Sequence, residues 1–137
     1  MIRRALQIAT AVMALIPITT GVLTMMGIDD PLYHASGLPR DALLDSSLRF
    51  FGGIWLVLGL AMMSLVPRIE HEGRWFAVLW GAVFLGGVGR VLSMLYLGLP
   101  PPAFVGFTVV ELVGAPVFMV WQRWVAASSK AAQAHRR

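Results

Sequence analysis

The chain has 137 residues, of which 58% are hydrophobic and 13% are charged, and its mean hydropathy is +0.75. An ordinary soluble domain carries about 25% charged residues, and a soluble protein this small cannot bury so much apolar surface. The composition therefore excludes an ordinary soluble domain and favours an integral membrane protein. Its net charge is +4, and the basic residues lie beside the apolar segments. We therefore expect membrane lipid, and no nucleic acid, as its partner.

The first apolar segment covers approximately residues 5–27, directly after Arg3 and Arg4. It is too long for the apolar region of a signal peptide, and no cleavage pattern of small residues follows it before Asp29. We therefore predict a retained transmembrane helix.

Three further helices are expected along the chain, and a basic tail follows the last of them. They cover about residues 40–66, with the membrane span from about residue 50, then 75–97 and 103–121, with the tail at 122–137. From Ala126 onward the tail is expected to be a solvated segment, with a frayed helix on anionic head groups as the alternative. Each span has the length of roughly 20 residues that crosses a bilayer, and continuous apolar runs favour helices over a barrel. The predicted fold is an all-α integral membrane four-helix bundle, forming a single domain over residues 1–137.

Basic residues indicate the orientation of this bundle. One side of a four-span chain carries Arg3, Arg4, Arg68, Arg74, Arg123, Lys130, Arg136 and Arg137. The other side carries a single basic loop residue, Arg40. Because positive residues accumulate on the cytoplasmic side, we predict that the N- and C-termini are cytoplasmic.

Two charged residues lie well inside the predicted spans, Arg90 and Glu111. An ionisable group at a helix centre costs about 2.5–3.5 kcal/mol on insertion scales. Arg90 stands ten residues before Pro100 and Glu111 stands ten residues after Pro101. A hairpin that turns at these prolines brings both groups to one depth, so we predict a charge-assisted hydrogen bond between them.

Other small and polar residues share the helix faces of this predicted pair. Ser93 and Thr108 are expected to satisfy its remaining donors and acceptors, and the glycines at 86, 87 and 89 to admit a neighbouring backbone. Pro116 is expected to kink the fourth helix and to release the carbonyl of Leu112. The pair has two open interpretations, a structural one that fixes helix register and a ligand-binding one.

Arg49 has two alternative partners. Its spacing of four residues from Asp45 favours a local pair on the helix surface. The alternative is that it reaches Glu111 beside Gly52 and Gly53, which would create a site with two arginines and one carboxylate. Such a site would suit a carboxylate or phosphate head group.

No other motif indicates chemistry. The chain has no cysteine, which excludes disulfides and thiol catalysis, and Glu70-His71-Glu72 has no further metal ligand near it in sequence. We therefore predict no catalytic residues, no metal site and no cofactor. The small residues Ala82 and Gly86 permit a homodimer without requiring one.

The chain resembles a bacterial membrane family known as domain of unknown function 4345. The resemblance rests on Leu48-Arg49-Phe50-Phe51-Gly52-Gly53, Gly87-Val88-Gly89-Arg90-Val91-Leu92-Ser93, Gly98-Leu99-Pro100 and Glu111-Leu112-Val113-Gly114. It implies a small multi-pass protein of the bacterial inner (plasma) membrane, with Arg49, Arg90 and Glu111 as its characteristic charges. It implies no activity.

Three functions are compatible with these residues. The favoured one is a non-enzymatic module that binds a lipid, an anionic amphiphile or a partner membrane subunit at the polar cluster. The second is a small four-helix transporter, although an arginine beside the membrane carboxylate works against proton exchange. The third, an enzyme on a lipophilic substrate, has the least support because acid–base catalysis usually needs a second titratable group.

Overall fold

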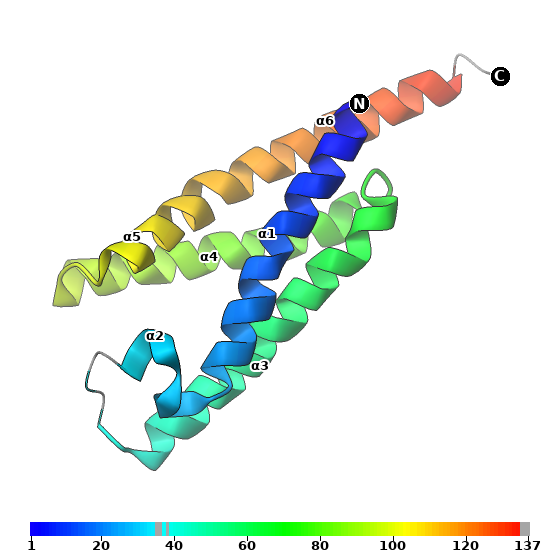
Figure 1. Ribbon diagram of the computed structural model, residues 1–137. Helices are drawn as coiled ribbons and strands as arrows, with labels where there is room; N and C mark the ends of the chain where they lie inside the picture. The colour runs from blue at the N-terminus through cyan, green and yellow to red at the C-terminus, as the bar shows by residue number, and fades with distance from the viewer. Residues whose placement is uncertain (35–36, 38, 135–137) are drawn as a thin grey trace. The chain divides into compact units, whose positions relative to one another are not determined.

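The computed structural model describes residues 1–34, 37 and 39–134, and these residues are helical or lie in turns and short connections, with no strand among them (Figure 1). The long helices are α1 (Ile2–Thr24), α3 (Ala42–Leu65), α4 (Gly73–Leu97), α5 (Pro102–Val109) and α6 (Ala115–Ala134), and a π-helical turn, η3 (Val110–Gly114), joins the last two. The short elements are η1 (Gly27–Asp29), α2 (Pro31–His34) and η2 (Val66–Arg68). The predicted all-α fold is confirmed.

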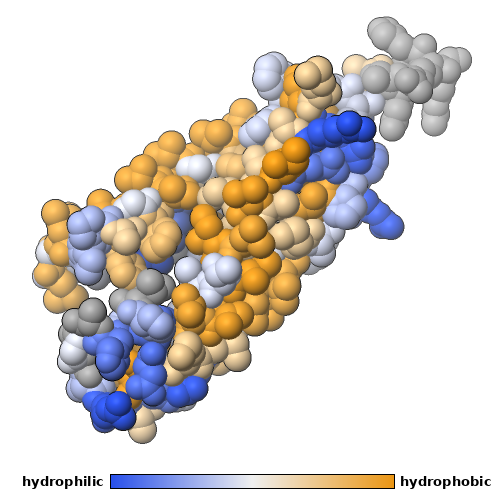
Figure 2. All heavy atoms as spheres, in the orientation of Figure 1, coloured by the Kyte–Doolittle hydropathy of each residue, from blue (hydrophilic) through white to orange (hydrophobic). Residues whose placement is uncertain are grey.

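Four helical stretches are long and apolar enough to cross a membrane: Ile2–Thr24, Ala42–Arg68, Gly73–Leu97 and Pro102–Ala131. Large apolar side chains in their middle parts point outward, with exposed fractions of 64% for Val57, 68% for Leu85 and 65% for Val120. Figure 2 shows hydrophobic residues along the helices and hydrophilic residues gathered near helix ends. Because water would penalise this surface, these helices indicate a multi-pass membrane protein.

The helix ends differ from the predicted ones where local signals outweigh hydropathy. α1 ends at Thr24, and Gly27 follows in the left-handed region with φ 71°. α3 begins at Ala42, later than expected, because the Asp41 carboxylate caps it by accepting a hydrogen bond from the Leu44 amide at 2.9 Å. The expected basic tail is helical as far as Ala134. The last three tail residues lie outside the described residues.

Internal contacts group the chain into two compact units, which are described separately. In the unit of residues 7–66, α1 and α3 approach so closely that glycine is required at the contact. A Cβ at Gly21 would lie 2.6 Å from the Leu56 nitrogen, and one at Gly59 would lie 2.7 Å from an Ile18 side-chain carbon. The Trp55 indole donates to the Thr20 hydroxyl at 2.9 Å, which satisfies a polar group between apolar helix faces.

The second unit comprises residues 1–6 and 67–137, and its core lies between α4 and α6. Phe76 and Trp80 of α4 are almost fully buried, and Trp80 stacks on Phe118 of α6 with 4.2 Å between ring centroids. α4 ends at Leu97, the next residue, Gly98, has φ 90°, and α5 begins just after Pro101. The proline-rich segment thus turns the chain sharply, as predicted.

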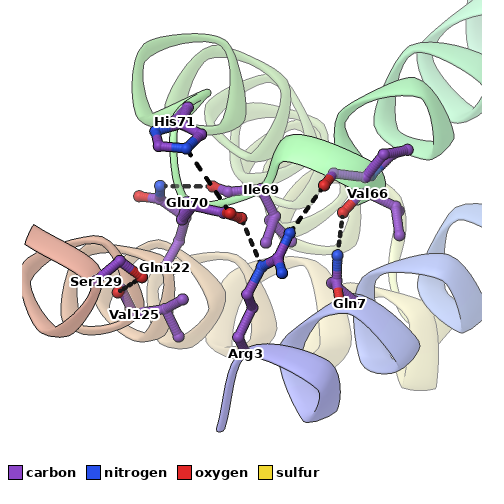
Figure 3. Close-up of polar contacts among 10 residues, drawn as sticks. Arg3, Gln7, Val66, Ile69, Glu70, His71, Gln122, Val125 and Ser129 are labelled. Atoms are coloured by element: carbon purple, nitrogen blue, oxygen red, sulfur yellow. Dashed lines mark hydrogen bonds and ion pairs between the residues drawn. The ribbon is translucent and has the colours of Figure 1, made fainter. Parts of the chain in front are cut away.

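The connection between η2 and α4 is held by side chains from the start of α1 and from α6 (Figure 3). The Arg3 Nε donates to the Glu70 Oε2 at 2.8 Å, and its Nη2 donates to the Pro67 carbonyl at 3.1 Å. The buried Gln122 Nε2 donates to the Ile69 carbonyl at 2.9 Å. These bonds fix the backbone in front of α4.

Adjacent glycines in α3 give a matched test of the α1–α3 contact. A Cβ at Gly52 would lie 2.6 Å from the Met25 nitrogen, whereas one at Gly53 would meet nothing within 4 Å. Gly52→Ala should lower the free energy of unfolding by about 1–3 kcal/mol, as overpacking does. Gly53→Ala should leave it unchanged or raise it. Unfolding in mixed micelles measures both, and equal behaviour of the two variants would contradict the proposed packing.

The contact of Glu70 with Arg3 predicts a pH dependence. Burial raises the pKa of Glu70, but a backbone hydrogen bond and Arg3 outweigh burial and hold this pKa below its ordinary value of 4.5. The stability contributed by the ionised Glu70 carboxylate is therefore fully present above the pKa that this group has in the unfolded chain. It is lost as pH falls through the lower pKa of the folded protein. It should be less than about 1 kcal/mol, as for partly exposed ion pairs. Melting curves at falling pH should show a smaller loss for Glu70→Gln than for the wild type.

Candidate functional site

Arg90 of α4 and Glu111 of η3 form the central polar contact of their unit. The Arg90 Nε donates to the two carboxylate oxygens of Glu111, at 2.9 Å and 3.2 Å. The side chain of Glu111 is 8% exposed and that of Arg90 is 34% exposed. The pairing that was predicted from the equal spacing of these residues about the proline turn is therefore present.

A close approach of the two helices brings this pair together. A Cβ at Gly87, one turn before Arg90, would lie 2.9 Å from the Glu111 Cβ and 3.0 Å from the Leu112 Cγ. Gly86 and Gly89 have nothing within 4 Å of such a Cβ. Of the three glycines expected to admit a neighbouring backbone, only Gly87 faces η3.

Glu111 lies in a π-helical turn, which the sequence did not predict. The turn covers Val110–Gly114, and Pro116 follows it. Because proline has no amide hydrogen, Pro116 cannot donate to the Leu112 carbonyl as an α-helical residue would. The expected kink therefore takes the form of a widened turn at the carboxylate itself. Single π-helical turns are frequent at functional sites.

The guanidinium of Arg90 retains unused donors. Its hydrogen bonds within the described part of the chain come from Nε alone and go to Glu111. The group also lies over the ring of Phe104 in α5, with 5.7 Å from Cζ to the ring centroid, within the range of a cation–π contact. Both Nη groups are therefore available to an additional acceptor on the exposed side of the arginine.

Ser93 and Thr108 were expected to complete the pair, and the structure gives them other surroundings. The buried Thr108 hydroxyl donates to the Phe104 carbonyl at 2.9 Å, a bond to the preceding turn that is common in apolar helices. Ser93 is exposed on α4. Neither residue is hydrogen-bonded to Arg90 or Glu111 among the described contacts.

Arg49 belongs to the other unit and makes local contacts there. Its Nε and Nη2 donate to the Asp45 carboxylate at 2.7 Å and 3.2 Å, and its Nη1 donates to the Met25 carbonyl at 3.0 Å. The carboxylate of Asp45 also accepts from the Ile28 amide at 3.1 Å. Of the two partners considered for Arg49, the local one is thus occupied, and these bonds join the ends of α1 and α3.

The residues expected to be poor metal ligands have other contacts. Glu70 is bound to Arg3, and His71 lies 3.8 Å from the same carboxylate. In the described part of the chain, no three histidine, aspartate or glutamate side chains are grouped so as to hold a metal ion.

Comparison with known proteins identifies one family. The model of a family described as a domain of unknown function (DUF4345) matches residues 5–122. A search of curated proteins found no match, and a search of solved structures also found none. The matched range contains Arg90, Glu111 and the proline turn between them.

The glycines of α4 provide a test of the polar contact. Gly87→Ala should push α4 away from η3, lengthen the bonds between Arg90 and Glu111, and lower the free energy of unfolding by about 1–3 kcal/mol. Gly89→Ala, whose Cβ meets nothing, is the matched control. Unfolding in mixed micelles measures the difference. A Gly87→Ala protein as stable as Gly89→Ala would contradict the close approach.

Proposed function

The chain belongs to the DUF4345 family, and we propose that it is a binding module of the bacterial inner membrane. In this proposal Arg90 binds the anionic head of a lipid or amphiphile, and Glu111 holds the guanidinium in place. The family itself supplies no activity, so the proposal is argued from the geometry around Arg90.

The unused donors of Arg90 carry the proposal. A guanidinium presents donors in a planar fork that matches carboxylate and phosphate oxygens. Here Glu111 occupies Nε, and both Nη groups lack a partner within the described part of the chain. Unpaired donors are costly in apolar surroundings. A ligand oxygen at the exposed side of Arg90 would remove that cost.

Glu111 and Phe104 restrict the position of the guanidinium. Two contacts from one carboxylate fix the direction of Nε, and the ring of Phe104 lies against the cation. A donor that is already oriented loses less conformational entropy when a ligand binds. This arrangement supports recognition of an anion by the arginine over a purely structural pair, in which no donor need remain unused.

The proposed orientation places the site in the outer half of the membrane. Basic residues cluster at the chain ends and in the connection before α4, which favours cytoplasmic termini. The turn after α4, with Gly98 and the three prolines, would then face the opposite side. Arg90 lies eight residues before Gly98, or about 12 Å along a helix. The ligand would therefore be reached from the outer leaflet.

A small transporter is the alternative function, and it fits the contacts less well. Exchange of a proton for a cationic substrate needs a carboxylate that is released from its counter-ion. Glu111 is buried and is bonded to Arg90 through both oxygens.

Binding to a partner membrane subunit, with a carboxylate of that subunit in place of a lipid head group, would use the same Arg90 donors.

Exchange of the two charges tests the proposed function. Removing Arg90 alone would leave the buried Glu111 carboxylate without its partner, which costs about 3–5 kcal/mol. The double variant Arg90→Glu with Glu111→Arg keeps a pair but puts the carboxylate at the exposed position and the guanidinium at the buried one. It should fold, yet the amount of anionic lipid or amphiphile that co-purifies with it should be at least about tenfold lower than with the wild type. Native mass spectrometry in a mild detergent measures the bound molecule.

Thr108→Val is the matched control, because the Thr108 hydroxyl bonds only to its own helix among the described contacts. This variant should retain the co-purifying molecule. If the charge-exchanged protein retains it as well, the pair is structural only. A protein that co-purifies with a second polypeptide through Arg90, and with no anionic small molecule, would identify a subunit as the ligand.

A further inference from the structure

A groove of about 670 Å³ lies beside the start of α4 and the last turns of α6, within the unit of residues 1–6 and 67–137. Its volume is in the usual range for small-ligand sites. The lining residues are Glu70, His71, Gly73, Arg74, Ala77, Gln122, Arg123, Ala126, Ala127 and Lys130. None of them takes part in the contact of Arg90 with Glu111.

Three cations line the groove without an ion-pair partner. Arg74 comes from α4, and Arg123 and Lys130 come from α6. None of these three forms an ion pair among the described residues. The only acidic lining residue, Glu70, is bonded to Arg3 from the start of α1. The groove is therefore strongly positive, and its one carboxylate is already compensated.

Small residues open the space between these cations. Arg123, Ala126, Ala127 and Lys130 follow the spacing i, i+3, i+4, i+7, which places them on one face of α6. On α4, Gly73 and Ala77 lie one turn apart. The helical extension of α6 to Ala134 is essential, because a tail that left the helix after Trp121 would not build this face.

The floor of the groove is held in place by buried contacts. Gln122 is 2% exposed, and its Nε2 donates to the Ile69 carbonyl at 2.9 Å. A Cβ at Gly73 would lie 3.2 Å from that same nitrogen. The side chain of Glu72, the residue before α4, makes no capping hydrogen bond. Gly73 lines the groove and is the first residue of α4, so the positive end of the helix dipole lies there.

We infer that this groove binds a phosphate monoester, either free or carried by a lipid head group. A phosphate monoester carries about −1.5 to −2 charges at pH 7. Its oxygens can accept from two arginine side chains and an ammonium group at once, which makes it a better ligand here than a molecule with a single carboxylate. Arg74 and Arg90 are sixteen residues apart on α4, or about 24 Å. The groove is therefore a separate site from Arg90, and it does not depend on the function proposed there.

General attraction of basic residues to a membrane surface is the competing explanation, and it needs no groove. Purified protein in phosphatidylcholine nanodiscs, with and without phosphatidic acid or phosphatidylglycerol, separates the two. Phosphatidic acid carries a monoester and phosphatidylglycerol a diester, so the groove should favour phosphatidic acid. Glycerol 3-phosphate, titrated onto the protein in neutral detergent, tests a soluble source of the same group.

Variants then locate the binding. Arg74→Gln with Arg123→Gln should weaken binding of the preferred phosphate by at least about tenfold. Arg68→Gln, which removes an exposed cation of the same unit outside the groove lining, is the matched control and should bind normally. Ala127→Phe fills the groove and keeps every charge, so it should also lose binding, and it tests the site even if the double variant does not fold.

The outcomes are distinct. Binding of phosphatidic acid alone assigns a lipid ligand, and binding of glycerol 3-phosphate that depends on the groove variants assigns a soluble one. Equal binding of phosphatidic acid and phosphatidylglycerol, equal loss in Arg68→Gln, or full binding by Ala127→Phe would each overturn the groove as the site. Absence of binding to all three probes would overturn it as well.

Discussion

A charged group inside a lipid-facing helix needs a partner because hydrocarbon offers it none, and this constraint organises the unit that contains α4. Arg90 and Glu111 meet it together, since each would be costly alone. Their contact requires a close approach of α4 and η3, and this approach is possible because Gly87 has no side chain at the point where the two helices meet. The turn at Gly98 and Pro101 sets the depth at which the two residues meet. The contact of Arg90 with Glu111 therefore depends on both the glycine and the turn.

The same constraint explains the polar contacts elsewhere. In the unit of residues 7–66, Trp55 donates to Thr20 between two apolar helix faces. At the helix ends, the carboxylate of Asp45 accepts hydrogen bonds from Arg49 and from the Ile28 amide. Two buried groups depart from the rule: the Thr10 hydroxyl and the Trp80 indole nitrogen have no hydrogen-bond partner in the described part of the chain. Trp80 is compensated in part by its stacking on Phe118.

Sequence alone predicted the features that follow from hydropathy and spacing. The four apolar helices come from the length of the apolar runs, and the partnership of Arg90 with Glu111 comes from counting residues to the prolines. The π-helical turn was missed because Pro116 predicts only that one carbonyl is released, while the neighbouring helix decides how the backbone adjusts. Helix-face periodicity also could not separate Gly87 from Gly86 and Gly89, which differ in their contact with η3. The sequence left the tail open between a frayed helix and a solvated segment, because hydropathy marks where an apolar run ends and carries no information on where a helix ends.

The two proposed sites rest on different physical arguments, because unused donors have a different meaning in each environment. An exposed cation such as Lys130 is hydrated, so its lack of an ion-pair partner costs little. Such residues indicate a site only when a cavity, small neighbours and a compensated carboxylate accompany them, as they do beside α6. Arg90 lies within a candidate membrane span, where donors without a partner carry a desolvation cost. For Arg90 the two unused Nη groups themselves are the argument, and a pair that served structure alone would be expected to use them.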